Sequence, residues 1–349
     1  MRFYNSNHKF HCGVDLHAKS MYLCILDPSG AVVLHRNIRC VAEEFLRAIA
    51  PFREDIVVGA ECTYSWYWLA DLCRSEGIEF VLGHALYMKA IHGGKSKNDR
   101  IDSEKIARLL RGGTFPMAYV YPEQMRALRD LLRRRLFFVQ KRSELMAHIQ
   151  MTHHQYNLTA PAKSLVYKAN REKLELRFQD ESTNRMLESD LRMVEHYSAE
   201  IRKLEWFIPK TARNDAEIAL ILSLLKTIPG VGDILSLTLL YEIHDISRFA
   251  THQRFASYAR LIKPEKTSAG KTTGGGGKKI GNHHLKWALS EATVLMLAKS
   301  ETAQKYLKRL MKKGSKAKAL STMTHRLGKA VYYMLSRKEA FNPNFFFAH

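Results

Sequence analysis

The sequence predicts an α/β domain over residues 1–122, followed by a mostly helical chain to residue 349. Short apolar runs separated by turn residues alternate with helical patterns in the first part, whereas apolar residues at helical spacing dominate the rest. The charge changes at the same place. Residues 1–122 carry 15 Lys and Arg against 13 Asp and Glu, and residues 123–349 carry 40 against 21. We therefore expect a nearly neutral N-terminal domain joined to a strongly basic region.

The N-terminal domain is expected to begin with a meander of three strands between Phe10 and Ile38, with turn residues at Asp27–Gly30. Helices and strands then alternate: helix Ala42–Ile49, strand Ile56–Glu61, helix Tyr64–Arg74, strand Glu79–Leu82 and helix Asp102–Leu110. Strands that alternate with helices after an opening meander fit a mixed sheet. This is the element order of a ribonuclease H-like fold, an assignment that rests on analogy.

Residues 123–214 are expected to form a long helical linker. Leu128, Leu132 and Leu136 recur at helical spacing among many arginines, and a second charged helix is expected from about Arg171 to Phe207. Two long amphipathic helices in succession indicate a hairpin or coiled coil that can pair subunits. A plain helical linker without a role in assembly is the alternative.

Residues 215–349 are expected to be mostly helical and to contain a helix-hairpin-helix-like motif. The motif is Ile228-Pro229-Gly230-Val231-Gly232, which lies between two apolar helical runs. Gly230 and Gly232 allow a nucleic-acid backbone to approach closely, and the amides of the next helix can face a phosphate, with Asp233 as its N-cap. An ordinary helix–helix turn is the alternative.

Four acidic residues in the N-terminal domain are candidates for a metal site. Asp15 lies in an apolar strand, Glu61 ends another strand, and Asp99 and Asp102 stand three residues apart at a helix start. Residues three apart share a helix face, and hard cations such as Mg²⁺ prefer oxygen ligands. Carboxylates that converge on two divalent ions suit phosphoryl transfer on nucleic acid. Taken singly, these acids can also be a cap, a turn residue or a solvated strand end.

A glycine-rich basic segment lies between residues 263 and 284. Lys271, Lys278 and Lys279 stand among small residues, a composition that suits phosphate binding, and a hydroxyl such as that of Ser268 can serve as a nucleophile. Gly270-Lys271-Thr272 lacks the upstream glycine of a nucleotide-hydrolysing phosphate loop. A flexible basic loop is the alternative.

The composition indicates a polyanionic partner. The net charge is +21, and no acidic residue occurs between Thr302 and Lys338. The five cysteines form no C-x-x-C pair, which predicts reduced and mostly buried thiols. The sequence has no signal-peptide pattern and no long uncharged apolar stretch, so we expect a cytoplasmic protein without a membrane span.

Several of these motifs together resemble one family. Gly13-Val14-Asp15-Leu16-His17, Glu61-Cys62-Thr63 and Lys97-Asn98-Asp99-Arg100-Ile101-Asp102 resemble the catalytic domain of the DEDD insertion-sequence transposases, which are bridge-RNA-guided recombinases. The segment from Ile228 through Gly281-Asn282-His283-His284-Leu285 resembles their C-terminal transposase domain. The resemblance covers almost the whole chain, and the middle helices match the family's coiled-coil linker.

The resemblance implies a RuvC-like domain over residues 1–122 in which Asp15, Glu61, Asp99 and Asp102 bind Mg²⁺, or alternatively Mn²⁺. It also implies a DNA-binding transposase domain over residues 215–349 that carries a serine nucleophile, matched here by Ser268. The expected partners are DNA (the element ends and the target), a non-coding guide RNA, and further copies of the chain in a dimer or tetramer.

The leading hypothesis is a transposase that cleaves and rejoins DNA by metal-assisted phosphoryl transfer, with Ser268 as the attacking oxygen. A metal-dependent junction nuclease that uses water is one alternative, because it needs the four carboxylates but not the serine. A nucleic-acid-binding protein without catalytic activity is the other.

Overall fold

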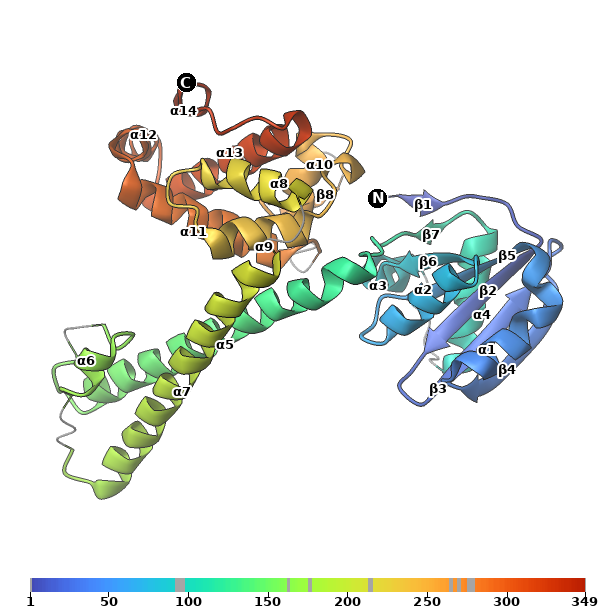
Figure 1. The fold of residues 1–349 in the computed structure, drawn as a ribbon, viewed down its shortest axis with the longest axis horizontal. Helices are drawn as coiled ribbons and strands as arrows, with labels where there is room; N and C mark the ends of the chain where they lie inside the picture. The colour runs from blue at the N-terminus through green and yellow to red at the C-terminus, as the bar shows by residue number, and fades with distance from the viewer. Residues whose placement is uncertain are drawn as a thin grey trace. The chain divides into compact units, whose positions relative to one another are not determined.

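The computed structural model describes residues 2–91, 98–161, 164–174, 178–212, 216–263, 266–268, 271–274 and 280–348. They form two compact units, Met1–Gln124 and Met125–His349. Figure 1 shows the sheet-containing first unit in blue and the helical second unit in green to red. The prediction of a mixed α/β N-terminal region followed by a helical one is confirmed.

The first unit is built on a five-stranded mixed sheet (Figure 1). In spatial order its strands are β4 (Val32–Arg39), β3 (Ser20–Leu26), β2 (Phe10–Leu16), β5 (Ile56–Glu61) and β6 (Glu79–Gly83). The pairs β2–β3 and β3–β4 are antiparallel, whereas β2–β5 and β5–β6 are parallel. The short strands β1 (Phe3–Tyr4) and β7 (Phe115–Pro116) form a separate antiparallel pair. The central position of β2 places Asp15 in the middle of the sheet.

Helices cover both faces of this sheet. They are α1 (Ala42–Ile49), the 3₁₀ helix η1 (Ala50–Asp55), α2 (Trp66–Ser75), α3 (Ala85–Ile91) and α4 (Asp99–Arg111). Side chains along a strand alternate between the two faces. On β2, Cys12, Val14 and Leu16 belong to a buried cluster with α1 and α2. Gly13 therefore faces α4 on the other side, and Asp15 shares that face.

The second unit begins with an antiparallel helical hairpin. Its long helices are α5 (Glu123–Gln155) and α7 (Glu181–Ala212), with the short helix α6 (Lys168–Arg171) between them. Arg135 Nε donates to Glu205 Oε1 at 2.9 Å, and further along α5 His148 contacts Asp190. Residue numbers on α5 rise from 135 to 148 while those of their partners on α7 fall from 205 to 190, so the two helices are antiparallel. Whether this hairpin pairs subunits stays a prediction.

The remainder of the second unit is a helical bundle with one small β-hairpin. The helices are α8 (Ala216–Lys226), α9 (Asp233–Ile243), the 3₁₀ helix η2 (Ile246–Arg248), α10 (His252–Tyr258), α11 (His283–Lys299), α12 (Glu301–Met311), α13 (Lys316–Arg337) and α14 (Pro343–Phe347). The hairpin consists of β8 (Lys266–Ser268) and β9 (Lys271–Gly274). From Leu235 to Ile243 every residue of α9 is buried, because α8 and α11 pack against it. Helix α9 is thus the centre of the bundle.

Two expected helix starts are wrong. Helix α4 begins at Asp99 and not at Asp102, because the side chain of Asn98 caps it by accepting a hydrogen bond from Ile101 N at 2.8 Å. Helix α9 has Gly232 at its N-cap position, and Asp233 is its first residue, where it pairs with Lys226. An acidic group in the first turn still favours the helix through the macrodipole. None of the described helices is both long and apolar enough to cross a membrane.

Candidate active site

The strand register brings Asp15 and Glu61 next to each other. In the parallel pair β2–β5, Val14 is aligned with Ala60. Asp15 and Glu61 are the next residues on their strands, so both lie at the carboxyl end of a central strand. Ligands of α/β sheets bind preferentially at this edge. The sequence prediction of two carboxylates at strand ends is therefore consistent with the geometry.

A glycine allows α4 to approach β2 closely enough to bring its acids to Asp15. A Cβ at Gly13 would lie 2.1 Å from Ser103 O and 2.4 Å from Ala107 N, both backbone atoms of α4. His35 of β4 also holds the first turn of α4, since its Nε2 lies 3.0 Å from Arg100 O. These contacts fix the N-terminus of α4, and hence Asp99, over the end of β2.

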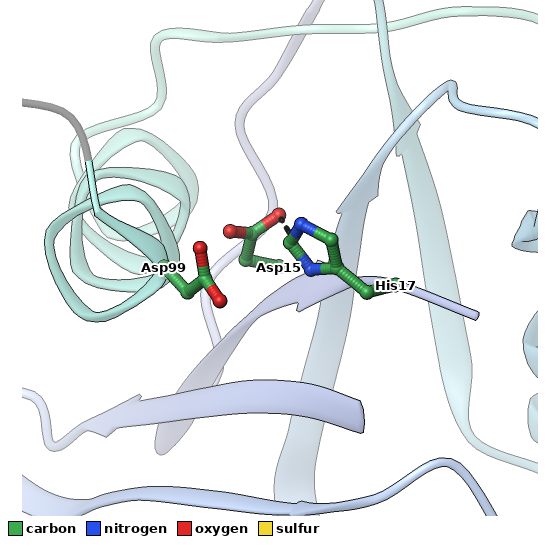
Figure 2. Close-up of side chains that lie close together, drawn as sticks. All are labelled: Asp15, His17 and Asp99. Atoms are coloured by element: carbon green, nitrogen blue, oxygen red, sulfur yellow. Dashed lines mark ion pairs between the residues drawn. The ribbon is translucent and has the colours of Figure 1, made fainter. Parts of the chain in front are cut away.

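Asp15, His17 and Asp99 form the tightest group of metal-ligating side chains in the described part of the chain. One ligand atom from each residue lies within 4.8 Å of the others, and Figure 2 shows the three side chains turned toward one another. His17 Nδ1 lies 3.9 Å from Asp15 Oδ1. His17 was not among the site residues predicted from the sequence. A signal was present, because residues two apart near a strand end share a face.

Glu61 and Asp102 are outside this tight group but act on it electrostatically. The pKa of Asp15 is raised to about 6, mainly by burial, while His17 lowers it and the negative charges of Asp99, Asp102 and Glu61 raise it. Asp102 also has a local partner, since its Oδ1 lies 3.3 Å from Lys105 Nζ. All four predicted acids are thus close enough for their charges to interact.

The donor set of this site fits a divalent cation. A carboxylate whose pKa is raised by burial and by three like charges is destabilised in its ionised form, and a bound cation would remove that repulsion. Carboxylate oxygens suit Mg²⁺ and Mn²⁺, whereas an imidazole nitrogen such as that of His17 is more typical of transition metals. The residues present therefore fit a divalent ion held mainly through oxygen.

The structure places Ser268 in a β-hairpin of the second unit. Ser268 ends β8 and is aligned with Lys271, the first residue of β9. Lys271 is exposed. Lys278 and Lys279 lie outside the described residues. The hairpin therefore brings the backbone of the candidate nucleophile beside one of the predicted phosphate-binding lysines.

The segment that carries Ser268 begins and ends at neighbouring residues of the helical bundle. Arg260 Nε donates to Gly281 O at 2.9 Å, and the backbone N–H of Asn282 donates to Tyr258 O at 2.6 Å. A Cβ at Gly281, whose φ is +93°, would lie 2.6 Å from Tyr258 O. The two ends of this segment, near residues 260 and 281, are thus held together.

A buried ion cluster anchors the returning end. The side chain of Glu242, only 2% exposed, accepts hydrogen bonds from Arg129 Nε at 3.0 Å, Arg133 Nε at 2.6 Å and Asn282 Nδ2 at 2.7 Å. The other end of the Asn282 amide caps α11 by accepting from His284 N at 2.9 Å. Burial opposes ionisation of Glu242, but these donors together lower its pKa to about 2. The cluster joins α5, α9 and the start of α11.

His283 and His284 stand at the start of α11 with ring centroids 3.8 Å apart. Burial, followed by the positive charge of Arg133, lowers the pKa of His284 to about 4. Burial also lowers the pKa of His283. Both rings are therefore neutral near pH 7, and each retains a nitrogen that can accept a proton or a hydrogen bond.

The two motif glycines differ in their surroundings. Gly230 has a φ of +86°, and a Cβ there would lie 2.7 Å from the backbone of Leu295 in α11. At Gly232, no atom of the described residues other than its chain neighbours lies within 4 Å of the place of a Cβ. Gly230 is thus required for the turn and for helix packing, whereas the open space at Gly232 is compatible with a backbone that approaches from outside.

Carboxylates at the ends of central strands, in a chain whose helical unit is strongly basic, are typical of enzymes that act on the phosphodiesters of nucleic acid. Comparison with known proteins agrees. Residues 12–157 match a model for DEDD-type IS110 transposases, described as "Transposase", and residues 222–308 match "Transposase IS116/IS110/IS902 family". The chain belongs to this family of transposases.

Two relatives are similar over long stretches. A putative transposase, y4qE, of Sinorhizobium fredii is 25% identical over 273 residues, which cover 78% of this chain and 66% of that protein. The transposase for insertion sequence element IS1111A of Coxiella burnetii is 22% identical over 339 residues, covering 94% of this chain and 90% of the relative.

Proposed function

We propose that this protein is a transposase that cleaves and rejoins DNA by phosphoryl transfer, with Ser268 as nucleophile and a divalent metal held by the acidic group. The observation that carries the proposal is the convergence of Asp15 and Asp99 at the end of the central strand, where repulsion contributes to the raised pKa of Asp15. The family membership supports the reaction class. Residues 1–122, 123–214 and 215–349 act as catalytic domain, helical linker and DNA-binding domain in this proposal.

Asp15, Glu61, Asp99 and Asp102 hold the metal, Mg²⁺ or Mn²⁺, and His17 lies close enough to join or orient this set. A bound divalent ion would neutralise charge on the scissile phosphate and favour the alkoxide form of a nearby hydroxyl. The chain supplies the fixed geometry. Gly13 lets α4 contact the sheet, and the strand register sets Asp15 beside Glu61.

In the transfer step, Ser268 Oγ forms a bond to phosphorus, and the bond from phosphorus to one DNA oxygen breaks. The proton lost by the serine hydroxyl balances the proton gained by the departing DNA hydroxyl. Lys271, aligned with Ser268 across the hairpin, places a positive charge near the phosphate. The neutral rings of His283 and His284 lie at the base of the same segment.

The remaining partners follow from the family and from the surface. A guide RNA and assembly of the chain into a dimer or tetramer belong to the proposal. Exposed aromatic residues along the helical hairpin support assembly, since Phe137 on α5 is 41% exposed and Trp206 on α7 is 65% exposed. Apolar side chains at such positions are typical of helix–helix interfaces between subunits.

A covalent-adduct assay tests the proposal. The full chain, its element RNA, labelled element-end and target DNA, and Mg²⁺ are incubated and separated under denaturing conditions. Wild type is expected to give a labelled protein band that is lost in Ser268→Ala and in Asp15→Ala. Cleaved DNA without an adduct, unchanged by Ser268→Ala, would establish a nuclease that uses water. DNA binding without any cleavage by the wild type would indicate a nucleic-acid-binding protein without catalytic activity.

A further inference from the structure

The positive charge of the second unit is concentrated at its C-terminal end. Residues 301–338, which form α12, α13 and their connection, contain 11 Lys and Arg and a single acidic residue, a net charge of +10. The two long helices of the hairpin, α5 and α7, contain 12 Lys and Arg against 9 Asp and Glu, a net charge of +3. The excess that attracts a polyanion therefore lies mainly on α12 and α13.

Many cations of the hairpin have acidic partners of their own. Along α7, Arg185 Nε lies 3.0 Å from Glu181 Oε1, and Lys203 Nζ lies 2.7 Å from Glu200 Oε1. Further pairs on the hairpin are Arg192–Glu188, Arg202–Glu195 and Lys141–Glu144. Such pairs leave little net field for a distant anion, because the two charges cancel beyond a few ångströms.

Five lysines at the α12–α13 connection are different. Lys308, Lys312, Lys313, Lys316 and Lys318, here named the lysine corner, are all exposed. Within the residues that the structure describes, none of their side chains forms an ion pair or a hydrogen bond. The single acid of this region, Glu301, is already engaged, since its Oε1 lies 2.7 Å from Lys305 Nζ. The charge of the lysine corner is therefore not neutralised within the described chain.

The fold holds the lysine corner in one place. Lys308 on α12 and Lys312, the C-cap residue of α12, are four residues apart and lie on the side opposite Ala303 and Tyr306, which are buried. Helix α13 starts at Lys316, where Ser315 Oγ caps it by accepting from Lys318 N at 3.3 Å. Figure 1 shows α12 and α13 joined directly at this end of the bundle.

We propose that the lysine corner is a docking surface for the phosphate backbone of duplex DNA that grips it without reading its sequence. A lysine ammonium is a flexible point charge, whereas base edges are read mainly by the planar fork of arginine or by amides. Arg309, the one arginine among residues 308–318 of the sequence, donates to Phe347 O at 3.2 Å and stacks on Tyr306. Contacts of this kind set the position of DNA and leave sequence choice to other parts of the complex.

Duplex DNA fits this surface better than single strands do. Proteins that bind single strands stack the bases on exposed aromatic rings. Among residues 301–338 the only large hydrophobic side chain that is exposed is Met311, and Tyr306 is buried. Residues 301–338 therefore offer charge without an exposed aromatic ring of their own. Four of the five lysines of the lysine corner lie beyond residue 308, where the match to the C-terminal family model ends.

This inference rests on the proposed function only in taking DNA as the substrate, and its test needs no strand transfer. The five lysines are changed together to glutamine in the full chain. The matched control removes the same number of charges from paired positions of the hairpin: Arg185→Gln, Arg192→Gln, Arg202→Gln, Lys203→Gln and Lys141→Gln. Binding to a DNA duplex without element sequence is measured over a series of salt concentrations.

The expected result is a shallower salt dependence in the lysine-corner variant only. Each phosphate contact contributes roughly 0.9 to the slope of log K against log salt, so five lost contacts lower the slope by about 4 to 5. The control variant should keep the wild-type slope to within about 1. Exposed substitutions of this type change stability by about 0.5 kcal/mol or less, so both variants should fold. Thermal unfolding checks this, and Lys312→Gln with Lys313→Gln serves as a milder pair.

Two outcomes would overturn the inference. An equal decrease in the salt slope of DNA binding in the lysine-corner variant and the hairpin control would show that net charge determines binding and the position of the lysines does not. A loss seen with an RNA duplex of the same sequence but not with DNA would assign the surface to RNA. A failure of the proposed function can be distinguished from a failure of this inference. A chain that forms no Ser268 adduct with DNA can still lose part of the salt dependence of its DNA binding when the lysine corner is changed.

Discussion

Replacing Gly13 with alanine tests whether the packing of α4 on β2 sets the geometry of the acidic group. The added Cβ would lie 2.1 Å from Ser103 O and 2.4 Å from Ala107 N. Real Cβ contacts are essentially never shorter than 3.0 Å, so α4 must retreat by at least 0.9 Å, the difference between 3.0 and 2.1 Å. Both contacts are to the backbone of α4, and rotation of a side chain cannot relieve them.

Asp99 is the first residue of α4 and moves with it, away from Asp15. A displacement of about 1 Å in a reacting group typically costs on the order of 100-fold in rate. We expect a loss of this size in the rate of adduct formation by Gly13→Ala at saturating DNA, together with weaker Mn²⁺ binding in calorimetric titration. Overpacking should also cost about 1–3 kcal/mol of folding stability.

Gly59→Ala is the matched control. Gly59 is aligned with Gly13 in the sheet, but its added Cβ would meet the end of the flexible Leu110 side chain at 2.7 Å, near the other end of α4. We expect a smaller loss of stability, since the Leu110 side chain can shift, and near wild-type metal binding. Wild-type metal affinity and adduct rate in Gly13→Ala would refute the argument. So would equal functional losses in the two variants, since the contact would then act only through general stability.

Four further predictions concern the second unit. Gly230→Ala should lower stability by about 1–3 kcal/mol in urea unfolding, because it meets both a positive φ and the backbone of α11. Gly232→Ala should leave stability unchanged, so weaker DNA binding by this variant would locate a backbone contact there. The lowered pKa of Glu242, about 2, contributes stability that is fully present above its unfolded pKa and is lost as pH falls toward 2. Wild type should therefore lose about 3 kcal/mol more than Glu242→Gln between pH 7 and pH 2 in unfolding measurements. Asn282→Ser keeps a capping oxygen for α11 but loses the donor to Glu242. It should slow adduct formation without changing half-saturation by DNA, whereas a parallel fall in rate and melting temperature would mean a purely structural role.

The elements of the fold could largely be predicted from the sequence because their signals are local. The helix Ala42–Ile49 and the strand Ile56–Glu61 were predicted with the bounds that the structure has. The start of α4 was missed because two side chains, Asn98 and Asp102, each have the chemistry of an N-cap. Only the structure shows which of them accepts the hydrogen bond, and it is Asn98.

The acidic residues of the candidate site could be predicted from the sequence, but their arrangement in space could not. Asp15 and Asp99 are 84 positions apart, and no local pattern states that a glycine two residues before Asp15 lets α4 reach the strand. His17 was missed for a related reason, since its role depends on where α4 lies. The cluster of Glu242 with Arg129, Arg133 and Asn282 also joins distant segments, and a lone glutamate in an apolar helix pattern gives no indication of its partners.

Charged groups in this chain depart from ordinary surface pairing in three places. Asp15 is half-buried among like charges, Glu242 is buried with two arginines, and the lysine corner has no partner in the described chain. Stability alone does not favour these arrangements over uncharged ones, because apolar packing could replace a buried ion pair at little cost and like charges repel. In our proposals each arrangement becomes favourable once a further component is added: a cation at Asp15, DNA at the lysine corner, and at Glu242 the end of the segment that carries Ser268. We therefore infer that these three places hold another molecule or a reacting segment in position.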